Sequence, residues 1–242
     1  MSDKESAPPS EHARRVREMF ATIARRYDLL NHLLSGNIDK RWRRSVAKAL
    51  FATLSQGEAR ILDVACGTGD LSLTLFESGK AQIVGLDFCR PMLEIAKAKA
   101  RRSGFRVSFI EGDALDLPFR DVSFEAVTIA FGLRNLASVE AGFNELLRVL
   151  KPGGRVAVLE FSKPKAAVLR SLFGFYFTTL LPLFGGLISG SKSAYQYLPE
   201  SVSRFPDQNE LASIMKEVGF VEVSFQNLTG GIAALHLGTR AK

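Results

Sequence analysis

Cysteine is scarce in this chain of 242 residues, which contains only Cys66 and Cys89. The two do not form a CxxC pair, and nothing around them has the ligand spacing of a zinc site, so we expect neither a disulfide framework nor a bound metal. The N-terminus, "MSDKESAPPSEHARR", lacks the apolar stretch that a secretory signal requires. We therefore expect a cytoplasmic protein whose mature form begins with this polar stretch.

Acidic residues are fewer than basic ones, 25 against 32, which gives a formal net charge of +7. A surface with this balance attracts anions, so nucleic acid and anionic membranes are both candidate partners. The basic residues gather in residues 12–28 and 39–50, where they are typical of the solvated faces of amphipathic helices. No RNA-binding signature accompanies them, and we do not expect nucleic acid as a partner.

Short apolar segments alternate with helical patterns along most of the chain. Strands are expected at residues 60–65, 81–87, 107–114, 124–132, 154–161, 221–228 and 231–240, and helices at 70–78, 90–102, 138–150 and 206–220. Two or three further helices precede the first strand. This order predicts an α/β fold, a doubly wound and mostly parallel seven-stranded sheet whose last two strands form an antiparallel hairpin.

One insertion interrupts the alternation, at residues 162–205. Residues 171–191 contain no charged side chain and are about as long as a membrane span. Pro182 and the pair Gly185 and Gly186 interrupt this run. We favour a buried or lid-forming helical pair over a surface that touches a membrane or a greasy substrate, and over a true span.

The stretch "ILDVACGTGDLSL" runs from an expected strand into a glycine-rich turn. A phosphate-binding turn rarely offers carboxylates, and the third glycine of the dinucleotide fingerprint is replaced by Ser72. Asp63, Asp87 and Asp113 stand at or near the ends of three consecutive strands. Because the carboxyl ends of parallel strands meet at one edge of a sheet, we expect these acids to converge on one cleft.

The spacing of the acids indicates a ligand. Asp87 lies about 20 residues after the glycines, where an acid accepts both hydroxyls of a ribose. Asp113, with the amide of Ala114 beside it, suits the amine of adenine. An acidic pocket of this kind suits an adenosine that carries positive charge and no phosphate. S-adenosylmethionine has that chemistry and is the predicted cofactor. The alternative for each acid is to cap the helix that follows it.

Nearly the whole chain, from about Val16 to Arg240, resembles the ubiquinone/menaquinone biosynthesis C-methyltransferase family. The glycine turn and "LKPGG" occur in many methyltransferases, whereas "YDLLNHLLSG", "FGLRN" and "LEFSKP" are specific to this family. The resemblance implies a Rossmann-like class I S-adenosylmethionine-dependent methyltransferase. Many members have asparagine where this chain has Asp113, and some have serine where it has Ala130. Together with the residue pattern, the resemblance gives the expected cofactor-binding set of Asp63, Gly67, Thr68, Gly69, Asp87, Asp113 and Ala114.

The reaction implied by the resemblance is methylation of a ring carbon of a prenylated quinol. Demethylmenaquinol is favoured over the benzoquinol of the ubiquinone pathway because Cys66 stands where ubiquinone-pathway members tend to have glycine. Arg134 is the expected catalytic residue, which would stabilise the quinol oxyanion directly or through a water; the alternative is a structural salt bridge. Tyr195 and His32 are weaker candidates. An RNA methyltransferase and a noncatalytic cofactor-binding protein are the alternative functions.

The resemblance also implies partners and a division of the chain. The prenylated quinol lies in the bilayer, so we expect transient contact with an anionic membrane surface, through the basic N-terminal helices and the apolar insertion. A homodimer is one alternative for the assembly. The expected parts are a disordered tail at 1–11 and one domain at 12–242, which comprises N-terminal helices at 12–56, a cofactor-binding core at 57–161, the apolar insertion at 162–205 and a C-terminal helix and strands at 206–242.

Overall fold

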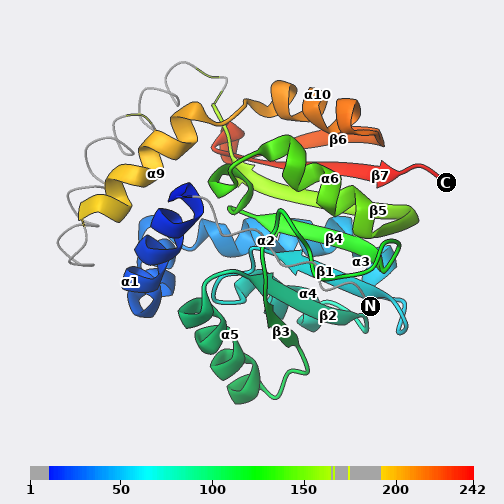
Figure 1. Ribbon diagram of the computed structural model, residues 1–242, viewed down its shortest axis with the longest axis horizontal. Coiled ribbons are helices and arrows are strands. Elements are labelled where there is room, and N and C mark those ends of the chain that lie inside the picture. The colour runs from blue at the N-terminus through cyan, green and yellow to red at the C-terminus, as the bar shows by residue number, and fades with distance from the viewer. Residues whose placement is uncertain (1–10, 165, 167–173, 175–191) are drawn as a thin grey trace.

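A seven-stranded sheet forms the centre of the computed structural model, which describes residues 11–164, 166, 174 and 192–242 (Figure 1). The strand order is β3-β2-β1-β4-β5-β7-β6, and β7 runs in the opposite direction to the other six strands. The strands are β1 (Arg60–Val64), β2 (Gln82–Asp87), β3 (Ser108–Glu111), β4 (Phe124–Ala130), β5 (Leu150–Phe161), β6 (Phe220–Leu228) and β7 (Ala233–Arg240). The predicted doubly wound α/β fold with a C-terminal hairpin is confirmed.

Helices cover both faces of this sheet. They are α1 (Glu11–Leu34), α2 (Ile38–Ala49), α3 (Phe51–Leu54), α4 (Asp70–Glu77), α5 (Arg90–Ser103), α6 (Val139–Val149), α9 (Lys192–Arg204) and α10 (Gln208–Val218), with 3-10 turns η1 (Leu133–Asn135) and η3 (Thr229–Gly231). Three of them precede β1, as expected. The helix α10 begins where Asp207 and Glu210 form a capping box, which satisfies backbone donors at the start of the helix.

The alternation of apolar side chains along each strand builds two cores. In β1, Ile61 packs with residues of α2, α3 and α4, while its neighbour Leu62 packs on the other face with α6 and α10. Both side chains are fully buried. The central strands are therefore apolar on both faces, as expected for parallel strands under two helical layers.

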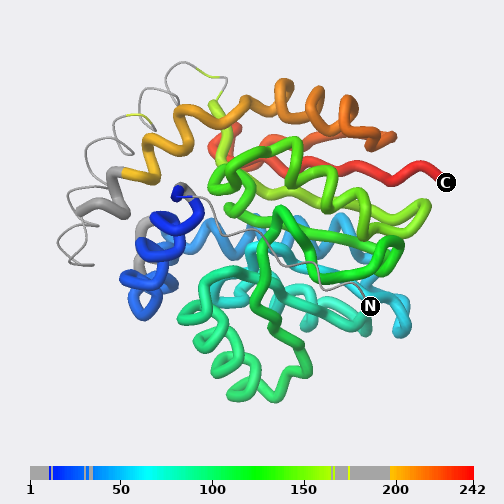
Figure 2. Tube along the Cα trace, viewed as in Figure 1, coloured from blue at the N-terminus to red at the C-terminus, as the bar shows by residue number. Residues whose placement is uncertain are grey.

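The strand order reverses between β1 and β4. The strand β1 pairs with β2 on one side and with β4 on the other, so the loops that leave β1 and β4 diverge. Ligands bind at such a switch point in open α/β sheets. The long helix α1 lies across this end of the sheet and contacts α5, α2 and α9, and Figure 2 shows α9 running beside it.

The predicted apolar run at 171–191 lies outside the described residues, except for Gly174. The side chain of Tyr195 lies outside them as well. In the part of the chain that the structure describes, no helix is both long enough and apolar enough to cross a membrane.

Candidate active site

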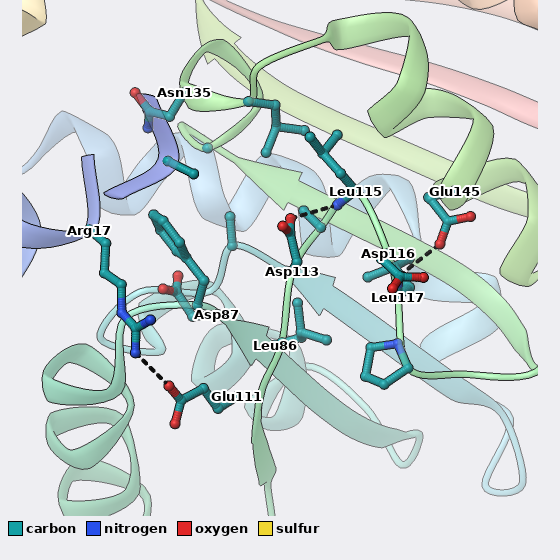
Figure 3. Close-up of a pocket in the computed structure, with 18 of the residues that line it drawn as sticks. Arg17, Leu86, Asp87, Glu111, Asp113, Leu115, Asp116, Leu117, Asn135 and Glu145 are labelled. Atoms are coloured by element: carbon teal, nitrogen blue, oxygen red, sulfur yellow. Dashed lines mark hydrogen bonds and ion pairs between the residues drawn. The ribbon is translucent and has the colours of Figure 1, made fainter. Parts of the chain in front are cut away.

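A cavity of about 1290 Å³ opens at the carboxyl ends of β1 to β4 (Figure 3). Its wall on the sheet side comes from the loops that follow these four strands, and α1 supplies the opposite wall. The lining includes Ala65, Gly67, Leu86, Asp87, Glu111, Asp113, Ala114, Leu115 and Phe131 on the sheet side, and Arg17, Phe20 and Tyr27 on α1. The site therefore lies between the switch point and the N-terminal helix.

The glycine turn borders this cavity at Gly67. Gly67 has a φ of 54°, and a Cβ built there meets no atom within 4 Å, so the backbone leaves open space on the cavity side. At Gly69, which has a φ of 83°, there is no room for a side chain, because a Cβ would lie 2.9 Å from the Cβ of Ala96 in α5. The turn thus packs closely on α5 while it exposes backbone to a ligand.

Asp87 is held rigidly in the cavity wall. Its Oδ2 accepts from the Gly67 amide and its Oδ1 from the Cys89 amide, both at 2.8 Å. Burial raises the pKa of this carboxyl to about 6, although the backbone donors oppose the shift. Its two oxygens retain lone pairs that can accept further hydrogen bonds, and binding of a ribose by Asp87 stays a prediction.

Asp113 and Ala114 border the same cavity one strand further along. The Leu115 amide donates to Oδ1 of Asp113 at 2.9 Å, which fixes the loop after β3 (Figure 3). Ala114 is buried, and with Leu86 and Leu115 it gives this part of the wall an apolar surface. An apolar wall with a carboxylate beside it has the chemistry that a purine with an exocyclic amine requires, so adenine binding at Asp113 and Ala114 stays a prediction.

Asp63, by contrast, lies beneath the glycine turn and does not border the cavity. Its side chain is 1% exposed, and it accepts from the Ser72 hydroxyl at 2.6 Å and from the Thr128 hydroxyl at 2.9 Å. Burial raises its pKa to about 6, and the charge of Asp87 adds to the shift. Asp63 therefore ties β1 to α4 and β4 and supports the turn from below.

Thr68 does not line the cavity either, and its side chain bonds to α1. Its hydroxyl donates to Asp28, which also accepts from Lys99 at 2.9 Å. Lys99 contacts Asp70 in addition, and Asp70 lies 3.1 Å from Arg43 and 3.4 Å from His32. We call the set Asp28, His32, Asp39, Arg43, Thr68, Asp70 and Lys99 the clamp cluster, because it joins α1 to the glycine turn, α2 and α5.

Part of the clamp cluster has the geometry of a metal site. Ligand atoms of His32, Asp39 and Asp70 lie within 4.8 Å of one another. The guanidinium of Arg43 contacts both carboxylates, and Lys99 contacts Asp70. Two cations of the protein thus already neutralise these acids, and the cluster serves to attach α1.

Arg134, the expected catalytic residue, lies in η1 next to the cavity and forms an ion pair. The Nη1 of Arg134 lies 2.7 Å from Oε1 of Glu160 and also donates to the Phe131 carbonyl. The Arg134 guanidinium lies 5.3 Å from the centre of the Phe161 ring. Burial raises the pKa of Glu160, and the charge of Arg134 opposes that shift. The structure thus contains the salt bridge of the alternative interpretation, and a role for Arg134 toward substrate stays a prediction.

Residues of α1 are the part of the site that sequence reasoning missed. Arg17 contacts Glu111 at 2.9 Å, and both residues line the cavity (Figure 3). Phe20 and Tyr27 line it as well and pack edge to face against each other. Burial raises the pKa of the Tyr27 phenol, and the positive charge of Arg134 opposes that rise. The helical spacing of Phe20 and Tyr27 predicts a buried face, and only the tertiary structure shows that this face covers the cavity.

The strand order is that of the class I methyltransferase fold, and the site lies at the switch point of this sheet. Solved structures with the same fold are similar to this chain. The chain is similar to the cyclase SpnF, with a TM-score of 0.68, 19% identity and 98% of each chain covered. It is also similar to a SAM-dependent methyltransferase from Aquifex aeolicus, with a TM-score of 0.59, 20% identity, and 81% and 88% of the two chains covered. At these identities the likeness shows the fold.

The sequence comparisons identify the family. Residues 9–240 match the model of the ubiE/COQ5 methyltransferase family, and the chain belongs to that family. A demethylmenaquinone methyltransferase from Thermus thermophilus is 52% identical, over 92% of this chain and all of the relative. One from Deinococcus radiodurans is 45% identical over 98% of each chain, and a ubiquinone/menaquinone biosynthesis C-methyltransferase from Geotalea uraniireducens is 45% identical over 96% and 98%. The predicted family is confirmed.

Proposed function

We propose that this chain transfers a methyl group from S-adenosylmethionine to a ring carbon of a prenylated quinol, with demethylmenaquinol as the substrate. The observation that carries this proposal is the 52% identity to a demethylmenaquinone methyltransferase along that relative's whole length. The acidic cavity at the switch point supports it, because a cationic adenosine needs carboxylates rather than a phosphate-binding turn.

The residues of the cavity fit this cofactor. Asp87 offers acceptors to the ribose hydroxyls, and the open backbone at Gly67 leaves room beside them. Asp113 and the apolar wall at Ala114 suit adenine. When bound, S-adenosylmethionine supplies an electrophilic methyl group on a positively charged sulfur, which the carboxylates of this cavity favour electrostatically.

Transfer to carbon requires a nucleophilic ring. A quinol becomes nucleophilic when a hydroxyl loses its proton to water and the oxygen pushes electron density to the adjacent carbon; the net reaction replaces a ring hydrogen with methyl and releases one proton. Arg134, which lies beside the cavity, is the cation to which we assign stabilisation of the oxyanion, and Glu160 and Phe161 hold its guanidinium in place. Positioning of the ring by the chain supplies the remainder of the rate.

A second candidate substrate is the benzoquinol of the ubiquinone pathway. It is favoured by the relatives whose names include both pathways, at 45% identity. One assay separates the two: pure protein with labelled S-adenosylmethionine receives both demethylated quinols under reducing conditions. Label in menaquinol alone supports the proposal, label in both adds the second activity, and label in neither overturns the proposal.

A further inference from the structure

A second groove lies on the outer side of α1, between that helix and α5. Its volume is about 770 Å³, and Arg25, Arg26 and Arg102 line it. We call it the basic groove. The same helix lines the candidate active site with residues such as Tyr27. The helix α1 is therefore a wall shared by two cavities, one acidic and one basic.

The basic groove carries an excess of positive charge. Its three arginines are exposed, and its single carboxylate, Glu94, lies 3.1 Å from the Lys97 ammonium. Within the part of the chain that the structure describes, no ion pair involves Arg25 or Arg102. The groove thus offers guanidinium groups to an external anion, and guanidinium suits phosphate especially well.

Apolar surface accompanies this charge. The groove is lined by Ala24, Ile95 and Ala98 in addition to the arginines. Leu29 is 62% exposed and stands four residues after Arg25, on the same side of α1. An exposed leucine beside arginines is the combination that amphipathic helices use at membrane surfaces, where the apolar group enters the acyl boundary and the cations meet headgroups.

We infer that the basic groove and Leu29 dock this protein onto an anionic phospholipid bilayer. This inference rests on the proposed function, since a prenylated quinol is itself a lipid of the bilayer. Docking through the outer face of α1 brings the membrane against a wall of the candidate active site. Charge complementarity selects anionic phospholipids, and the apolar lining favours a bilayer over a soluble phosphate.

Vesicle co-sedimentation tests the docking surface. The probe is a vesicle of equal parts phosphatidylglycerol and phosphatidylcholine, at low salt. The triple variant Arg25→Gln, Arg26→Gln, Arg102→Gln is expected to partition about a hundredfold more weakly, because each basic group near such a surface contributes about 1 kcal/mol. The matched control removes the same charge from exposed α2 positions with Arg41→Gln, Arg44→Gln and Lys48→Gln, and it should stay close to wild type.

Three outcomes would overturn the docking surface. They are equal losses in the two triple variants, equal binding of wild type to neutral and anionic vesicles, and displacement by inorganic phosphate at an ionic strength at which sodium chloride does not displace the protein. Both variants must methylate a water-soluble short-chain quinol at the wild-type rate, which shows that they fold. A wild type that methylates no quinol contradicts the proposed function, whatever the vesicles show.

Discussion

The Gly67 amide donates to Oδ2 of Asp87 at 2.8 Å and so fixes the end of β2 against the glycine turn that follows β1. The two are 20 residues apart in sequence, and this contact joins the loops after β1 and β2, both of which line the candidate active site. It also makes Asp87 the residue through which pH should act on cofactor binding.

Cofactor affinity should fall in mild acid. Burial raises the pKa of Asp87 to about 6, and the ribose hydroxyls need the ionised form as acceptor. Lowering the pH from about 7.5 to about 5.5 should weaken binding of S-adenosylhomocysteine roughly fourfold. Asp87→Asn should bind roughly 10-fold or more weakly at neutral pH, because a charge-assisted hydrogen bond is lost, and its pH dependence should be flatter. Isothermal titration calorimetry measures both, and a wild type whose affinity is unchanged at low pH would refute this role.

Asp63 should matter for stability more than for affinity. Asp63→Ala removes the acceptor of two buried hydroxyls, and it should lower the free energy of unfolding by about 2–4 kcal/mol. Urea denaturation measures the loss. In Asp63→Asn the amide oxygen keeps one acceptor, so its loss should be smaller, and equal losses in the two variants would be evidence against the hydrogen-bond explanation.

The pH dependence of stability has a definite sign at Asp63. Its folded pKa of about 6 is above the unfolded value, so its contribution is fully present below the unfolded value and is lost as the pH rises through about 6. Relative to wild type, Asp63→Asn should therefore gain stability between about pH 5 and pH 7. Thermal melts across this range measure the difference, and a constant difference would show that Asp63 does not titrate there.

A variant of Arg134 that keeps the positive charge distinguishes a structural role of this residue from a catalytic one. Arg134→Lys preserves a cation for Glu160 but loses the planar fork, so it should fold and bind cofactor normally while kcat falls roughly 100-fold. Arg134→Ala leaves Glu160 buried without its partner and should cost about 3–5 kcal/mol of stability. If Arg134→Lys turns over at the wild-type rate, the guanidinium has no part in the chemistry.

The clamp cluster should control how firmly α1 covers the cavity. Lys99→Met leaves Asp28 and Asp70 without their shared ammonium, so amide hydrogen exchange in α1 should rise and S-adenosylhomocysteine should dissociate faster. Lys97→Met is the matched control, since the one ion pair of Lys97 among the described residues is with the exposed Glu94 on the same helix. Similar exchange in the two variants would show that the cluster does not hold α1 down.

The strands could be predicted because β1, β2 and β4 are short segments rich in Val, Ile and Leu, and most of their residues are buried. The strand β5 begins at Leu150, earlier than expected, since "KPGG" reads as a turn. In the structure Gly153 takes a left-handed φ of 74° within the strand, and the register with β4 shifts there. Such an irregularity depends on the neighbouring strand and leaves no local signal beyond the glycines.

The candidate site was only partly predictable for a related reason. Asp87 and Asp63 both stand at strand ends, yet Asp87 is the last residue of β2 whereas Val64 follows Asp63 in β1. Because side chains alternate between faces, one residue of offset places Asp63 under the turn instead of in the cavity. The cover by α1 depends on charge pairs such as Asp28 with Lys99, 71 residues apart, which no local pattern reveals.

The central claim is methyl transfer to a quinol carbon, and a ring-deuterated substrate tests it most directly. Demethylmenaquinol that carries deuterium at the unsubstituted ring carbon is incubated with the pure protein and S-adenosylmethionine under reducing conditions, and the product is analysed by mass spectrometry. We predict a methylated product that has lost the deuterium, because the new carbon bond replaces it. A methylated product that retains the deuterium, or no methylated product at all, would contradict the account.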